Sequence, residues 1–125
     1  MIIVALLGVL ILFSLSVFQI LLILGKPLGN YAWGGQHEVL PNRLRVGSVF
    51  SIMLYIVFSI LLVSKAGLVD IIPDGLFLSV AIWVVTGYSV LGIFMNAISR
   101  SKKERLLMTP VVLLLAVIFL VVAVS

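Results

Sequence analysis

Residues 2–24 read IIVALLGVLILFSLSVFQILLIL and contain no charged side chain. An α-helix needs roughly 20 apolar residues to cross the hydrocarbon core of a bilayer, so this stretch is long enough to span it once. Three more uncharged stretches of similar length follow, at residues 46–64, 76–98 and 107–124. The sequence therefore predicts four membrane-spanning helices, about 2–24, 46–64, 76–98 and 107–124.

The composition excludes a water-soluble domain. Hydrophobic residues make up 64% of the chain and charged residues 10%, whereas soluble domains contain about 45–50% apolar and about 25% charged residues. Strands of a transmembrane barrel alternate between apolar and polar residues, and these stretches do not. The first stretch lacks the basic start and the cleavage site of a signal peptide, so we expect it to be retained. We expect an all-α integral membrane four-helix bundle that forms a single membrane domain over residues 1–125.

The basic residues predict the orientation in the membrane. The first loop (residues 25–45) and the third loop (99–106) hold seven of the eight, and the second loop (65–75) holds only Lys65. Basic loops stay on the cytoplasmic side. We expect a multi-pass protein of the cell membrane, with loops 25–45 and 99–106 in the cytoplasm and both termini outside.

The same placement bears on partners. Nucleic-acid binding needs a basic face that follows phosphates, but here the basic residues flank membrane helices, where lipid headgroups explain them. We therefore expect membrane lipid as a partner and no nucleic acid. A homo-oligomer or a larger membrane complex is compatible with the sequence.

Few chemistries are open to this chain. It has no cysteine and one histidine, so thiolate nucleophiles and cysteine-ligated metals are excluded. No HExxH motif or phosphate-binding glycine loop is present. We expect no cofactor and no metal, and no catalytic residue can be assigned.

Polar residues within the predicted helices indicate which faces pack inward, because helices in lipid associate through small and polar side chains. In the second helix Ser48, Ser51, Tyr55 and Ser59 form one stripe at helical spacing. The fourth helix beyond Pro110 is almost purely apolar, so we expect it to contact the most lipid, through residues such as Val112, Leu115 and Val122. Thr109-Pro110 is expected to begin that helix.

Gln19, Ser48, Ser51 and Asn96 share one depth, near the first loop. An amide left unpaired in hydrocarbon costs several kcal/mol. Either these side chains pair with one another and lock the bundle, or they line a cavity open to the cytoplasm.

The first loop reads GKPLGNYAWGGQHEVLPNRLR and is longer than a hairpin requires. Its aromatic and aliphatic residues favour folding back against the bundle as a lid. His37 and Glu38 offer a base and a carboxylate, and Gln36 and Arg43 offer hydrogen-bond donors. The candidate ligand-binding residues are Gln19, Trp33, Gln36, His37, Glu38, Arg43, Ser48, Ser51, Tyr55 and Asn96.

The stretch Tyr31-Ala32-Trp33-Gly34-Gly35, Leu40-Pro41 and Thr109-Pro110 resembles a family of small four-helix bacterial membrane proteins of unknown function. In that family a histidine and a tyrosine stand just before the tryptophan motif, whereas Asn30 and Tyr31 stand there in this chain and the histidine follows at position 37. The resemblance implies a four-helix architecture in a bacterial cell membrane and no mechanism.

Three functions stay open at this point. The favoured one is a non-enzymatic membrane protein that binds a lipid-like or amphipathic ligand or serves as an accessory subunit of a membrane complex. The second is a small transporter or channel subunit, although no helix carries the charged residue that ion pathways usually require. The third is an enzyme that acts on a membrane-borne substrate through the loop 25–45.

Overall fold

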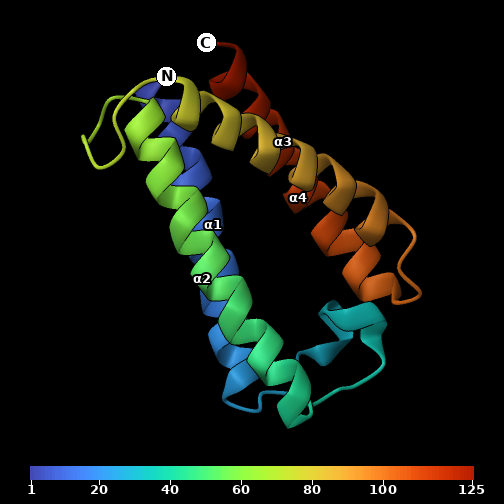
Figure 1. Cartoon of the computed structure of the whole chain (residues 1–125). Helices are drawn as coiled ribbons and strands as arrows, with labels where there is room; N and C mark the ends of the chain where they lie inside the picture. Colours follow the sequence, from blue (N-terminus) through green and yellow to red (C-terminus); the bar gives the residue numbers. More distant parts are fainter.

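The computed structural model describes all 125 residues as four long helices and two short 3₁₀ turns (Figure 1). Helices α1, α2, α3 and α4 cover Ile2–Ile23, Asn42–Lys65, Leu76–Ala97 and Lys102–Val124, and the turns η1 and η2 cover Gly29–Tyr31 and Trp33–Gly35. Each of the four helices is long and apolar enough to cross a membrane, and the chain contains no strand. The predicted all-α architecture of four membrane helices is confirmed.

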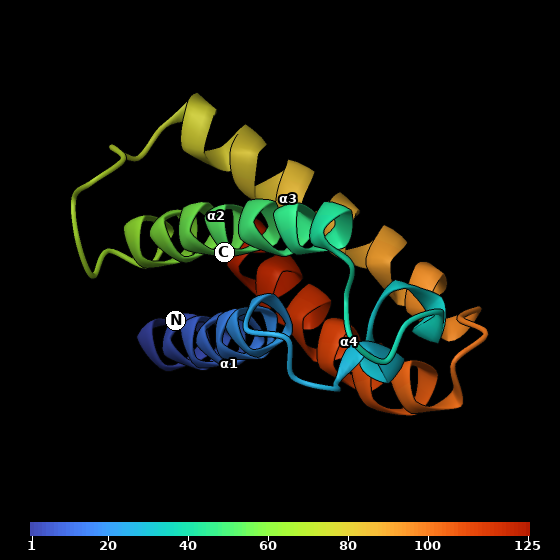
Figure 2. The same ribbon diagram turned by 90° about the horizontal axis from the view of Figure 1, so that it is seen from below.

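The helices form two pairs that diverge from one end of the molecule. Helix α1 packs along α2 and α3 packs along α4, and contacts between the two pairs are fewer. Figure 1 shows the pairs meeting at the end that carries both termini and separating toward the end that carries η1 and η2. The view from below in Figure 2 shows these turns beside the first residues of α4. The bundle is therefore a wedge.

A single hydrophobic cluster joins the two pairs at the terminal end, which we call the closed end. All four helices contribute to it. The Phe58 ring meets the rings of Tyr88 and Phe119 edge-on, with centroids 5.9 and 6.1 Å apart, an arrangement that aromatic pairs favour. The members of the cluster are Ala5, Leu12, Phe58, Leu61, Leu62, Leu78, Ile82, Val85, Leu115, Ile118, Phe119 and Val122.

Gly8 shows why the helices approach closely at this end. A Cβ added at Gly8 would lie 2.7 Å from Cδ1 of Leu62 and 3.0 Å from Cγ2 of Ile118. The absent side chain lets α1 contact α2 and α4 at one point, as small residues do in membrane bundles.

The prediction that α4 contacts the most lipid is wrong. Leu115 and Val122 are 5% and 0% exposed, and α4 has more buried residues than any other helix. Val112 is half-buried and faces Gly92 of α3. Lipid is as apolar as a packed leucine, so the lack of polar residues could not distinguish a buried face from a lipid-facing one.

Helix α4 also begins earlier than predicted. The N-cap is Ser101, whose hydroxyl accepts a hydrogen bond from the Glu104 N–H, and Pro110 therefore lies inside the helix. Thr109 is not a cap, and its buried hydroxyl has no hydrogen-bond partner. The sequence predicts a loop at the charged residues 102–105, but they form the first helical turn of α4 at the end of the bundle. Helix α2 likewise begins at Asn42 instead of residue 46.

The inward stripe of α2 is buried to different degrees. Ser48 is fully buried, whereas Ser51, Tyr55 and Ser59 are half-buried. The serine and threonine hydroxyls in α2 and α3 mostly donate to the carbonyl four residues earlier in their own helix; these are Ser51, Ser59, Thr86 and Ser89. These hydroxyls are hydrogen-bonded within their own helices and do not link one helix to another.

Candidate functional site

The first loop folds back onto the start of α4. The Ser101 hydroxyl donates to the Asn30 carbonyl, and the Gly34 N–H donates to the Glu104 carboxylate at 3.2 Å. The loop also closes on itself, because the Gly29 N–H donates to the Glu38 carbonyl at 2.8 Å. A Cβ at Gly29 would collide with the His37 carbonyl oxygen, so only glycine permits this crossing.

Trp33 is held in an unusual backbone conformation within the loop. Its φ is 53°, and Gly34 and Gly35 follow with φ of 71° each. A bulky residue at positive φ is uncommon and costs of the order of 1–3 kcal/mol. Trp33 is 47% exposed, but its indole contacts α2, where a Cβ at Gly47 would lie 2.8 Å from its Cζ2. The loop is thereby anchored to α2 as well as to α4.

A cavity of about 400 Å³ lies between the two helix pairs on the side that this loop covers. We call this half of the molecule the open end. All four helices and the loop contribute lining residues, and 13 of the 18 are hydrophobic. Ligand sites in proteins typically measure about 300–1,000 Å³, so the cavity is large enough for a small molecule or an alkyl chain. The lining residues whose side chains contain a polar atom are Gln19, Tyr31, Trp33, Tyr55, Tyr88, Ser89, Asn96 and Glu104.

The two amides predicted at this depth do not lock the bundle by pairing with each other. Gln19 lies beside Tyr55, yet its buried Oε1 has no hydrogen-bond partner. The Asn96 amide donates to the Gly92 carbonyl of its own helix at 2.8 Å. Both side chains line the cavity.

Glu104 is the charged residue of the cavity and was not among the predicted site residues. Glu104 is 7% exposed, and the only hydrogen bond to its carboxylate is the one from the Gly34 N–H. No basic side chain lies within ion-pair distance of it, since the one ion pair in the chain joins Lys65 and Asp74. Buried charges are usually paired. An acidic group in an apolar cavity without a cationic partner is therefore a feature that packing alone does not require.

The sequence contains a motif around Glu104 that predicts part of its environment. Ser101 and Glu104 have the spacing of a capping box, in which the glutamate at the third helical position bonds back to the N–H of the cap residue. Here the Ser101 N–H donates to the Ser99 hydroxyl instead, and Glu104 receives the N–H of Gly34. The motif predicts the helix start, but the diversion of the carboxylate into the cavity depends on where the first loop folds.

Four of the ten candidate ligand-binding residues line the cavity: Gln19, Trp33, Tyr55 and Asn96. The other six do not. Ser48 is buried and its hydroxyl is unpaired, Ser51 bonds within α2, and the remaining four lie on the loop or the start of α2 outside the cavity: Gln36, His37, Glu38 and Arg43. His37 and Glu38 therefore do not converge on a cleft.

A second, almost wholly apolar hollow of about 380 Å³ lies between α1 and α4. Leu15, Phe18 and Met108 line both this groove and the cavity. The groove wall otherwise consists of Leu10, Ile11, Ser14, Leu107 and Val111, and the Ser14 hydroxyl is occupied by the Leu10 carbonyl. Three side chains thus separate the cavity from a groove on the flank of the bundle.

Comparison of the chain with known protein families, with curated protein sequences and with solved structures finds no match. The resemblance to the four-helix bacterial family is supported only in its architecture, and membership in that family stays a hypothesis.

Proposed function

We propose that this chain is a small membrane protein that binds a lipid-like or amphipathic molecule in the cavity at its open end. The observation that carries the proposal is the form of the cavity, which has apolar walls from four helices and polar groups beneath the first loop. An amphiphile has the same division, with a tail that needs an apolar environment and a head that needs hydrogen bonds.

The groove between α1 and α4 supplies a route from the bilayer. Its walls are as apolar as the lipid beside them, so an alkyl chain can move along it without leaving a hydrophobic environment. Leu15, Phe18 and Met108 stand between the groove and the cavity. Methionine side chains adapt easily to different shapes, so little rearrangement is needed for passage.

The proposal includes an orientation. The basic residues of the first loop and of the start of α4 share one end of the molecule, and the positive-inside rule puts that end in the cytoplasm and both termini outside. The open end then faces the cytoplasmic leaflet of the cell membrane. Reporter fusions at Ser125 should show extracytoplasmic phosphatase activity; cytoplasmic fluorescence from the same position would reverse the orientation.

Native mass spectrometry of the protein released from its membrane tests the binding. The wild type should carry about one amphiphile per chain. Ser89→Leu should lose it, because position 89 lines the cavity and is 3% exposed. Gly87→Leu is the matched control, since a Cβ at Gly87 meets nothing within 4 Å. Equal retention by both variants, or an empty wild type, would refute the proposed function.

A further inference from the structure

The cavity differs in charge from the surface around it. The chain has eight basic residues, and seven of them lie at or near the open end, yet no lysine, arginine or histidine lines the cavity and Glu104 is its one charged residue. The nearby cations are directed elsewhere. Arg45 donates to the Leu40 carbonyl, Arg105 donates to the Ser99 carbonyl, and Lys103 lies over the Tyr31 ring.

Resting on the proposed function, we infer that the head of the bound amphiphile is a protonated amine or a quaternary ammonium, recognised by Glu104 and the aromatic rings of the cavity. An anionic head would meet the carboxylate with no cation to offset the repulsion. A neutral head would leave that carboxylate buried with a single backbone hydrogen bond, which is unfavourable for a charged group.

The hydrogen-bonding groups favour the protonated amine of these two heads, because a quaternary ammonium has no N–H to donate. The Glu104 carboxylate accepts only the Gly34 N–H although two oxygens can accept several bonds. The carboxylate therefore has unused acceptor positions, and a protonated amine brings up to three donors.

Aromatic side chains complete the environment of the head. Tyr31, Trp33, Tyr55 and Tyr88 all line the cavity, and the faces of such rings attract cations. One face of the Tyr31 ring already meets a cation, because Lys103 Nζ lies 5.8 Å from its centroid, and this leaves Trp33, Tyr55 and Tyr88 for the ligand. A carboxylate beside aromatic rings is the combination with which proteins bind alkylammonium groups.

Two sources carry this chemistry: a membrane lipid with an amine head, and a free alkylamine. The protein in a neutral maltoside detergent is mixed with equimolar phosphatidylethanolamine, phosphatidylglycerol and dodecylammonium, and adducts are counted by native mass spectrometry. At least one ammonium-bearing probe should exceed phosphatidylglycerol by about tenfold, because hydrogen bonds to charged groups are the stronger ones. The probe that dominates identifies the source.

Glu104→Gln should reduce that preference to about twofold or less, since it removes the charge and keeps the shape. Glu38→Gln is the matched control, because this exposed loop carboxylate does not line the cavity, and it should leave the ranking unchanged. Should Glu104→Gln fail to fold, the ranking of the wild type decides alone. Equal binding of all three probes overturns the ammonium assignment and leaves the proposed function standing, whereas binding of none overturns both.

Discussion

The closed and open ends of this bundle are made of the same four helices but differ in how those helices meet. At the closed end Gly8 and Ala5 allow α1 to contact its neighbours directly. At the open end Phe18 and Gln19 of α1 line a cavity between the pairs, and the first loop contacts the start of α4. In an apolar bundle, side-chain size rather than polarity decides where helices touch.

The largest effect should come from removing an aromatic ring at each end. Phe119 is fully buried in the closed end, so Phe119→Ala should lower the free energy of unfolding by about 3–5 kcal/mol through the void it leaves. Phe18 borders existing empty space at the open end, so Phe18→Ala should cost less than about 1 kcal/mol. Unfolding in mixed micelles with rising dodecyl sulfate measures both. Similar losses of unfolding free energy in the two variants would mean that the two ends are equally well packed.

Two glycines sharpen the comparison. Gly8→Leu should destabilise the bundle by about 1–3 kcal/mol through overpacking against Leu62 and Ile118. Gly87→Leu adds the same side chain where nothing lies within 4 Å, and it should stabilise α3 by up to about 1 kcal/mol because leucine is the better helix former. Both changes are measured by the same unfolding titration. A neutral Gly8→Leu would show that α1 does not pack closely there.

The loop offers a smaller and more local effect. Gly29→Ala should detach the loop, since its Cβ collides with the His37 carbonyl, and hydrogen exchange over residues 29–38 should accelerate while the helices stay protected. Gly34→Ala is the control, because a Cβ at Gly34 meets no atom within 4 Å. Its only cost is the left-handed backbone conformation, with φ of 71°, which should lower the free energy of unfolding by about 1 kcal/mol. If exchange is unchanged in Gly29→Ala, the loop is not held by this crossing.

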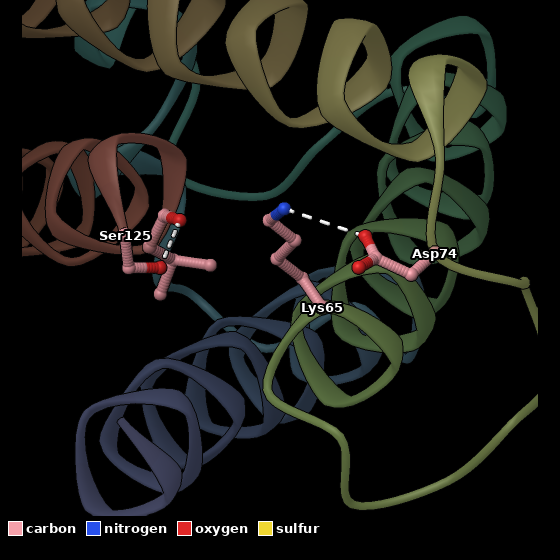
Figure 3. A network of polar contacts seen from close by, with 4 residues as sticks. Lys65, Asp74 and Ser125 are labelled. Atoms are coloured by element: carbon pink, nitrogen blue, oxygen red, sulfur yellow. Dashed lines mark hydrogen bonds and ion pairs between the residues drawn. The ribbon is translucent and has the colours of Figure 1, made fainter.

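The ion pair at the closed end should matter least. Lys65 Nζ lies 3.5 Å from the Asp74 carboxylate (Figure 3), and the Asp74 side chain is 83% exposed. Figure 3 also shows Ser125, whose hydroxyl donates to the Val122 carbonyl at 2.7 Å. Exposed pairs contribute about 0–1 kcal/mol, so Asp74→Asn should change unfolding by no more than that. A larger loss of unfolding free energy would mean that this ion pair contributes substantially to the stability of the closed end.

The sequence predicted the features that depend on composition and spacing. The uncharged stretches predicted all four helices. The shared depth of Gln19 and Asn96 marked the region of the cavity but left pairing and cavity lining as alternatives. Both follow from rules that act along a single helix, namely helix length against bilayer thickness and the cost of an unpaired amide.

The features that the sequence did not predict depend on how helices pair. The burial of Leu115 and Val122 could not be distinguished from lipid exposure by polarity. The entry of Glu104 into the cavity depends on the Gly34 N–H, which is 70 residues away in the chain. No periodicity within one helix contains that information.

Single cysteines on α3 test the central claim most directly, because the chain has none of its own. Thr86 and Ser89 are nearly equally buried, at 4% and 3% exposed, but only Ser89 lines the cavity. Ser89→Cys should react with N-dodecylmaleimide at least about tenfold faster than Thr86→Cys, because the thiol at position 86 is exposed only by local unfolding. A bound amphiphile should slow the reaction of Ser89→Cys. Equal rates at the two positions would contradict the existence of an accessible cavity at the open end.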